Sequence, residues 1–265
     1  MLAAMQELSA DARIIGIVGG LGPHAHVEFE RLLLSEAAAL RGRPLGDQDY
    51  PAWVLSSIPQ TPDRTAALLD GGASPVPALL TSLARLARAD AAFAAIPCNT
   101  AHAYLAELRA RASIPILDMI DLTLETVRSA APARVGLLAT TGTLRARVYH
   151  DRAQAGLPIV SLLDLEDGAR LQEELVMAAI YGPVVDGRRQ GGIKAGIVDG
   201  APRTRLEEAV TRLVDAGASR VILGCTELPL CLGRAEVCGA TLADPLQALV
   251  RASVAIARGD APLPS

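Results

Sequence analysis

The chain has 265 residues, of which 51% are hydrophobic, 20% charged and only 3% aromatic, and its 25 basic and 29 acidic residues give a net charge of −4. At roughly 150 residues per domain, this length predicts two modest domains. The composition excludes a disordered chain and a collagen-like fibre. Because there is no basic surplus, we expect no nucleic-acid partner.

Neither a membrane anchor nor a disulfide framework is expected. The longest uncharged run, Ala91–Ala106, has 16 residues, whereas a membrane helix needs about 18 or more. The segment Met1–Glu7 has no cationic n-region and no apolar run, so it does not resemble a secretory signal. Four cysteines are too few for a disulfide framework, and Cys225, Cys231 and Cys238 are not spaced as in a zinc knuckle. We therefore expect a cytoplasmic protein with reduced thiols, no bound metal and no membrane partner.

In chain order, short apolar segments alternate with segments of helical periodicity. Apolar runs of this length are typical of strands that are buried on both faces of a parallel sheet. The predicted strands are Arg13–Val18, Ala52–Leu55, Ala92–Ile96, Ile114–Leu117, Arg134–Leu138, Pro158–Leu163 and Arg220–Leu223. The clearest predicted helices are Val27–Leu40, Val76–Ala89, Ala103–Arg111, Leu122–Ser129 and Leu206–Ala216. This alternation predicts an α/β fold with parallel sheets.

A weak internal repeat divides the chain into two similar halves. Ile14–Gly20 matches Arg134–Thr140 as a strand that leads into a loop of small residues, and Ala94–Thr100 matches Val221–Glu227 as a strand that ends at a cysteine. We therefore expect two similar parallel-sheet α/β domains related by pseudo-two-fold symmetry, with the active site in the cleft between them.

The boundary between the two domains is predicted near Pro132. The expected N-terminal domain comprises residues 1–120 and is completed by residues 226–265, and the expected C-terminal domain comprises residues 121–225. Within the final segment, the tail from about Asp244 is predicted to return to the first domain.

Cys98 and Cys225 are the leading candidates for chemistry. Each stands where an apolar strand ends, and each is followed by hydroxyl or amide side chains. At the carboxyl end of a parallel strand the sulfur faces the ligand crevice, and the free N–H groups of a following helix favour a thiolate. A lone cysteine is more often a small buried hydrophobe, and we expect Cys231 and Cys238 to be packing residues. The repeat favours a functional role for the other two.

The glycine loop Gly20–Ala25 satisfies a loose dinucleotide-binding pattern. The next predicted strand ends without the acidic residue that binds ribose, and Pro23 lacks an N–H group for a phosphate. A substrate-binding turn is the better interpretation. Arg64 and Lys194 lie in loops, where cations can bind carboxylates, although a basic residue is more often simply solvated.

Six motifs together resemble the aspartate/glutamate racemase superfamily over residues 13–255. They are Gly19–Pro23, Thr61–Arg64, Cys98–His102, Leu138–Thr143, Ile193–Gly196 and Gly224–Leu230. Glutamate racemases usually have an Asp-Ser pair, a Ser and a His where this chain has Gly19-Gly20, His102 and Glu227. The chain is therefore similar to the aspartate-racemase-like branch, and hydantoin racemases and single-cysteine arylmalonate decarboxylases fit less well.

The resemblance implies a cofactor-independent amino-acid racemase that acts on aspartate, or next on glutamate. In it, Cys98 and Cys225 stand on opposite faces of Cα: one, as a thiolate, removes the α-proton and the other, as a thiol, protonates the opposite face. A homodimer is also implied, with a small amino acid as the only other partner.

The remaining site residues follow from the same resemblance. Arg64 and Lys194 are expected to bind a substrate carboxylate. The residues expected to bind the carboxylate and amino groups of the substrate are Asn99, Thr100, Thr141, Thr143 and Thr226. His102 and Glu227 are expected to orient the thiols. The glycine loop contributes possible specificity residues at Gly20, Gly22, His24 and His26, of which His26 replaces the usual threonine of the family.

Two alternatives stay open. One is an isomerase or decarboxylase of small dicarboxylic acids, in which one cysteine is a nucleophile. The other is a non-catalytic amino-acid-binding or redox-sensing protein whose thiols can form a disulfide.

Overall fold

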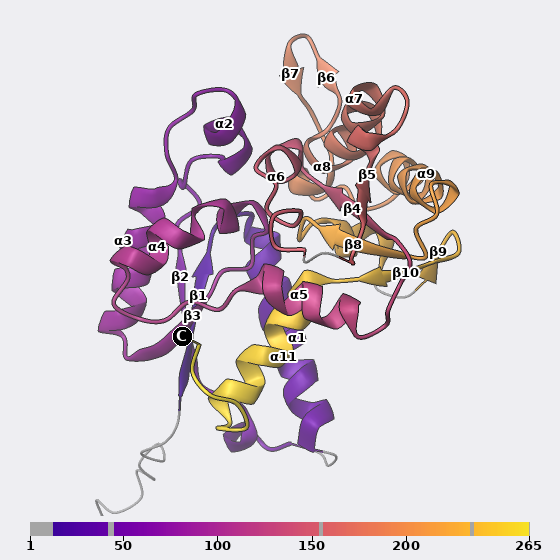
Figure 1. Cartoon of the computed structure of the whole chain (residues 1–265). Helices are drawn as coiled ribbons and strands as arrows, with labels where there is room; N and C mark the ends of the chain where they lie inside the picture. The colour runs from indigo at the N-terminus through magenta and orange to yellow at the C-terminus, as the bar shows by residue number, and fades with distance from the viewer. Residues whose placement is uncertain (1–12, 42–44, 154–155, 234–235, 265) are drawn as a thin grey trace, which may run out of the picture.

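The computed structural model describes residues 13–41, 45–153, 156–233 and 236–264. It has a mixed α/β architecture in which two sheets of mainly parallel strands lie in two halves of the chain (Figure 1). The segment Met1–Glu7, which we interpreted as lacking a secretory signal, lies outside the described residues. In the described ranges, no helix is long and apolar enough to cross a membrane.

The first half is organised around β1 (Ile14–Gly19). This strand lies between β2 (Trp53–Ser57) and β3 (Ala91–Ala95), and all three run parallel. Both faces are covered, because α3 (Val76–Arg88) packs against the strands and α1 (Pro23–Arg41) contributes Phe29 to the core around them. This accounts for the continuous apolar runs of the strands.

The segment Ile114–Leu117 differs from the prediction, because it forms an isolated parallel bridge and not a strand. Ala94 donates to the carbonyl of Pro115 at 2.8 Å and accepts from Leu117 at 2.9 Å. The proline has no N–H group to continue the ladder, and Asp118 then caps the next helix. The pairing therefore stops after one residue.

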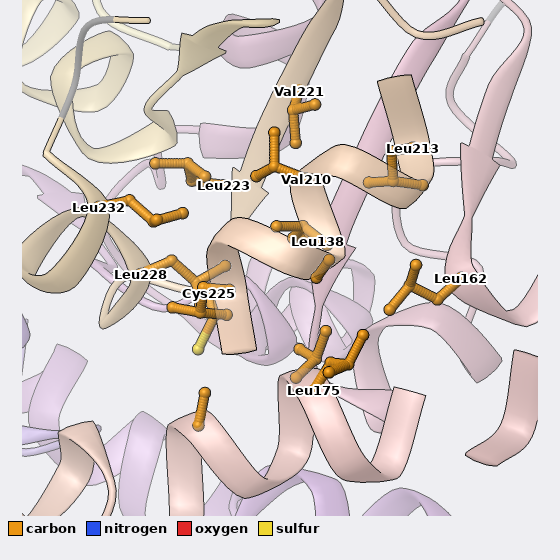
Figure 2. Packing of buried hydrophobic residues seen from close by; sticks show 14 of the residues in the cluster. Leu138, Leu162, Leu175, Val210, Leu213, Val221, Leu223, Cys225, Leu228 and Leu232 are labelled. Atoms are coloured by element: carbon orange, nitrogen blue, oxygen red, sulfur yellow. The ribbon is translucent and has the colours of Figure 1, made fainter. Parts of the chain in front are cut away.

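The second half contains a sheet of order β5-β4-β8-β10-β9. These strands are β4 (Val135–Ala139), β5 (Ile159–Ser161), β8 (Arg220–Gly224), β9 (Glu236–Val237) and β10 (Ala240–Ala243). All pair in parallel except β9 with β10. Figure 2 shows the leucine-rich core of this half, in which Cys225 lies at the edge of the cluster with its sulfur directed away from Leu223 and Leu232.

Short helices and one hairpin complete the fold. The described elements not yet named are η1 (Asp47–Asp49), α2 (Arg64–Leu69), η2 (Thr100–Tyr104), α4 (Leu105–Arg111), α5 (Met119–Arg128), α6 (Thr141–Arg145), η3 (Leu162–Asp164), α7 (Gly168–Leu171), the π-helical turn η4 (Gln172–Met177), α8 (Ala178–Tyr181), the hairpin strands β6 (Val184–Val185) and β7 (Arg188–Arg189), η5 (Ile193–Ala195), α9 (Ala201–Asp215), α10 (Leu228–Leu232) and α11 (Pro245–Ala257).

The sheet pairing corrects the expected domain boundary. We expected residues 226–265 to complete the first half, but β9 and β10 belong to the second sheet because β10 pairs with β8. The chain returns to the first half only after Asp244, which caps α11. This helix packs against α1 and α5, as Figure 1 shows, and adds Leu246 and Leu249 to the core around β1.

Candidate active site

Both candidate cysteines lie just beyond the carboxyl ends of parallel strands. Cys98 follows β3 of the first sheet, and Cys225 follows β8 in the second. Their residues are 6% and 7% exposed, and neither forms a disulfide. Because both strands direct these ends toward the junction of the two halves, the thiols reach one shared site.

This site is a small cavity with a volume of about 10 Å³, enough for about one water molecule. The first half contributes Leu21, Arg64, Thr65, Cys98, Asn99 and Thr100 to the wall, and the second half contributes Thr140, Tyr181, Lys194, Cys225, Thr226 and Glu227. The wall therefore draws on both halves of the chain.

Arg64 brings a buried cation to the cavity. It begins α2, whose first turn is capped by the Asp63 carboxylate, which accepts from Ala66 at 2.9 Å. The guanidinium donates to the carbonyls of Leu21 at 2.6 Å and Pro62 at 3.1 Å, while its Nε has no partner among the described residues. Burial opposes the charge, but interactions with Cys98 and Asp63 hold the pKa of Arg64 above its ordinary value.

Asn99 supplies a second buried donor without a protein partner. Tyr149 donates its hydroxyl proton to Asn99 Oδ1 at 2.5 Å, which fixes the orientation of the amide. Burial raises the pKa of Tyr149, so the phenol keeps this proton. Asn99 Nδ2 is buried with no partner in the described structure. Since buried donors are normally satisfied, Asn99 and Arg64 together mark a place for a ligand with acceptor oxygens.

A connected set of charges surrounds Cys225. Its thiol donates to Glu227 Oε2 at 2.9 Å, and Lys194 Nζ lies 2.8 Å from Glu227 Oε1. Burial alone would raise the pKa of Glu227, but Lys194 lowers it below its ordinary value. Burial opposes the charge on Lys194 as well, yet Glu227 raises the pKa of that ammonium. The ammonium also lies 5.3 Å from the centre of the Tyr181 ring.

Four threonine hydroxyls join the two halves. Three of them, Thr65, Thr100 and Thr140, line the cavity with the thiols, whereas Thr143, which we expected to bind substrate, does not. Thr100 Oγ1 lies 2.8 Å from Thr143 Oγ1 and 3.2 Å from Thr140 Oγ1, and Thr65 donates to Thr140 at 3.3 Å. Two of these residues, Thr65 and Thr100, come from the first half. The cluster therefore connects η2 and α2 to the start of α6 across the cleft.

Thr141 does not lie in the cavity wall, although we expected it to bind substrate. Its N–H donates to Met177 Sδ at 3.4 Å, and its hydroxyl accepts from Gln172 at 3.4 Å. Thr140 takes the wall position instead. It caps α6 by accepting from the Thr143 N–H, and the turn that follows directs Thr141 away. Thr226 lies in the wall as expected, 3.4 Å from Glu227 Oε2.

His102 supports the Cys98 loop from behind and is not part of the cavity wall. Its Nε2 accepts from the Met119 N–H at 3.2 Å, so Nδ1 carries the proton and donates to the Cys98 carbonyl at 2.9 Å. Burial lowers the pKa of His102, which keeps the ring neutral. The side chain is therefore placed to orient the loop that holds Cys98.

The glycine loop reaches the site through its backbone. Gly20 and Gly22 have φ values of +86° and +118°, which few residues other than glycine adopt. A Cβ on Gly22 would lie 2.5 Å from Glu227 Oε1. His26 is buried and its Nδ1 accepts from the Gly20 N–H at 3.3 Å, whereas His24 is exposed. The unusual His26 thus shapes the loop and does not line the cavity.

Sequence reasoning missed four residues of the wall: Leu21, Thr65, Thr140 and Tyr181. Thr65 and Thr140 are next to Arg64 and Thr141, which we had selected. Thr140 could have been predicted, because it directly follows the carboxyl end of the parallel strand β4, where ligands bind in such sheets. Tyr181 had no such signal, because it follows a π-helical turn and reaches the site only when the halves meet. The other two cysteines lie outside the wall: Cys231 is buried and donates to Val198, but Cys238 is exposed, contrary to the expected packing role.

The fold and site define a two-domain α/β protein with a pair of buried thiols at one cleft. The family model for Asp/Glu/Hydantoin racemase matches residues 18–253. The chain therefore belongs to this racemase family, which confirms the resemblance seen in the sequence.

Individual relatives agree with this assignment. An aspartate racemase from Picrophilus torridus is 25% identical, with a TM-score of 0.75 over 93% of this chain and 94% of that chain. A glutamate racemase from Francisella tularensis, solved with D-glutamate, is 18% identical with a TM-score of 0.61 over 94% of this chain and 82% of that chain, and shows the same fold. The broad specificity amino-acid racemase RacX from Bacillus subtilis is 29% identical over 136 residues, 51% of this chain, and the match spans 58% of its length.

Proposed function

We propose that this chain is a cofactor-independent amino-acid racemase that moves a proton at Cα of an acidic amino acid, aspartate first and glutamate next. The observation that carries the proposal is the pair Cys98 and Cys225, which follow strands of different sheets and line one cavity. The homodimer and the cytoplasmic location stay predictions.

Two thiols are needed because the proton must leave one face of Cα and arrive on the other. The thiolate of one cysteine takes the α-proton and becomes a thiol. The S–H bond of the second cysteine breaks, and its proton forms the new C–H bond on the opposite face. No electrons are exchanged with a further reactant, and the thiolate has moved from one sulfur to the other. Donors around the substrate carboxylate stabilise the charge that develops in between.

The charges of the wall favour a substrate with two carboxylates. Lys194 is paired with Glu227, whereas Arg64 has no carboxylate within salt-bridge distance among the described residues. The side-chain carboxylate of an acidic amino acid would supply acceptor oxygens for Arg64 Nε, which has no partner among the described residues. A neutral amino acid has no second carboxylate to offer that donor.

The test is incubation with L-aspartate in D₂O without added pyridoxal phosphate or metal. We expect D-aspartate with deuterium at Cα. Cys98→Ser and Cys225→Ser should each lose racemisation by at least about 10³-fold, because a hydroxyl is a much weaker acid than a thiol and proton transfer supplies about 10² to 10⁴. Cys231→Ser is the matched control, since this buried thiol lies outside the cavity wall, and it should keep wild-type activity.

Absence of exchange with every proteinogenic amino acid, or full activity of Cys98→Ser, would contradict the proposal. Mass spectrometry of the enzyme during turnover addresses the decarboxylase and isomerase alternative, because a nucleophilic cysteine would form a covalent adduct. Tight aspartate binding without exchange would instead indicate a binding protein.

A further inference from the structure

The two cavity thiols have unlike surroundings. Cys225 donates to a carboxylate, Glu227 Oε2, at 2.9 Å. Cys98 has no hydrogen bond to a carboxylate within the described residues, and the guanidinium of Arg64, in the same cavity wall, interacts with it. A guanidinium stabilises a thiolate, whereas a carboxylate stabilises the protonated thiol.

Glu227 is held in place from three directions. Its second oxygen, Oε1, pairs with Lys194 Nζ at 2.8 Å, and its side chain is 3% exposed. Gly22 of the first half approaches so closely that a Cβ there would lie 2.5 Å from Oε1. The carboxylate therefore bridges one ammonium and one thiol, and the opposite half of the molecule closes over it.

The electrostatics agree with this geometry. Burial and the adjacent carboxylate raise the pKa of the Cys225 thiol well above its ordinary value, although Lys194 opposes the shift. Lys194 lowers the pKa of Glu227 and keeps it ionised. The carboxylate therefore accepts the hydrogen bond of the S–H group and does not itself donate a proton.

We propose that Glu227 is a positioning residue that holds Cys225 as the proton donor of the resting enzyme and leaves Cys98, beside Arg64, as the resting base. The inference rests on the proposed function for its catalytic meaning. The resting enzyme accepts the enantiomer whose Cα–H faces Cys98. Its turnover leaves a Cys225 thiolate next to a carboxylate, with Lys194 as the nearby cation, and this form must regain its proton or process the opposite enantiomer.

The first test measures each thiol in the wild-type protein. The probe is iodoacetamide, applied from about pH 6 to pH 10 with peptide mass spectrometry to separate the cysteines, because the exposed Cys238 also reacts. We expect Cys98 to reach half of its maximal alkylation rate at a lower pH than Cys225. The reverse order, or equal midpoints, would overturn the inference, and neither outcome depends on racemase activity.

The second test removes the charge of Glu227 while keeping its shape. In Glu227→Gln, the alkylation midpoint of Cys225 should fall by about one pH unit or more, which corresponds to an approximately tenfold faster reaction below the midpoint. Glu208→Gln, which changes an exposed carboxylate paired with Arg212, is the matched control and should leave the midpoint in place. An unchanged midpoint in a folded Glu227→Gln protein, judged by its circular dichroism and Tm, would overturn the inference. If this variant does not fold, the order of the Cys98 and Cys225 alkylation midpoints in the wild-type protein still tests the inference.

Kinetics supply a readout that a purely structural role would not move. Because L- and D-aspartate have equal free energies, kcat/KM must be the same in both directions. If the two thiols differ in pKa, kcat differs between L- and D-aspartate and KM differs by the same factor. In Glu227→Gln, the ratio of the two kcat values should move toward one. A ratio that stays at its wild-type value contradicts the inference. A shifted Cys225 midpoint without any racemisation would instead reject the proposed function alone.

Discussion

Arg64 and Asn99 show how single side chains prepare the cavity for a ligand. Each places a buried donor, Nε and Nδ2 respectively, where no described protein atom accepts from it. Leaving a buried donor unsatisfied costs about 1 to 3 kcal/mol. A ligand that supplies carboxylate oxygens recovers part of this cost on binding.

Gly22 is the residue at which the first half touches the charged pair of the second. We expect Gly22→Ala to lower activity by at least tenfold, because its Cβ would lie 2.5 Å from Glu227 Oε1 and displace that carboxylate. The positive φ of +118° should also cost about 1 to 3 kcal/mol of stability. Steady-state rates and chemical denaturation measure the two effects.

The matched control is Gly71→Ala. Gly71 also has a positive φ, of +64°, but a Cβ there meets nothing within 4 Å. This variant should lose a smaller amount of stability and keep its activity. If Gly22→Ala were as active as Gly71→Ala, the close approach of the glycine loop to Glu227 would have no functional role.

At the scale of elements, α2 and α8 form a link across the cleft. Tyr181, the last residue of α8, donates to Asp63 Oδ2 at 3.2 Å, and Asp63 caps α2 with its other oxygen. The hydrogen bond between Tyr181 and Asp63 therefore connects the second half to the helix that begins with Arg64.

Tyr181→Phe should weaken the contact between the two halves without disturbing either helix. It removes the hydroxyl but keeps the ring that lies beside Lys194. We expect a loss of about 1 kcal/mol of stability and a several-fold rise in KM for aspartate, measured by thermal unfolding and initial rates. Tyr104→Phe is a suitable control, because Tyr104 is outside the cavity wall and should leave KM unchanged. An unchanged KM in Tyr181→Phe would show that this link does not limit substrate binding.

Elements with strong local signals were predictable from the sequence, and those set by long-range pairing were not. The apolar runs of β1, β3, β4 and β8 and the periodicity of α3 identified them correctly. The strand β10 lacked such a signal, because it is defined by pairing with β8. Helix α11 does carry local signals, an Asp244 cap, Pro245 in its first turn and apolar residues at helical spacing, which our prediction of helices did not use.

The same distinction applies to the site. The repeat identified Cys98 and Cys225 because both stand directly at strand ends. It could not identify Tyr181, or choose Thr140 over Thr141, since those choices depend on how the two halves meet and on the direction of the first turn of α6.

For the whole molecule, two buried histidines and one half-buried histidine predict sensitivity to acid. Burial lowers the pKa values of His26, His102 and His150. In the unfolded chain these rings take up protons near pH 6.5. The unfolded state therefore binds more protons than the folded state below that pH, and the free energy of unfolding should decrease as the pH falls below about 6.5.

We expect each histidine to contribute a slope of up to about 1.4 kcal/mol per pH unit, and Tm should fall between pH 7 and pH 5. His102 is the most informative position, since a proton on its Nε2 would remove the acceptor for Met119 and loosen the loop of Cys98. His102→Asn should reduce the slope, whereas a change at the exposed His24 to Gln should not. A Tm that stays constant from pH 7 to pH 5 would mean that these buried rings become protonated without unfolding, and that the polar contacts behind Cys98 tolerate the added charge.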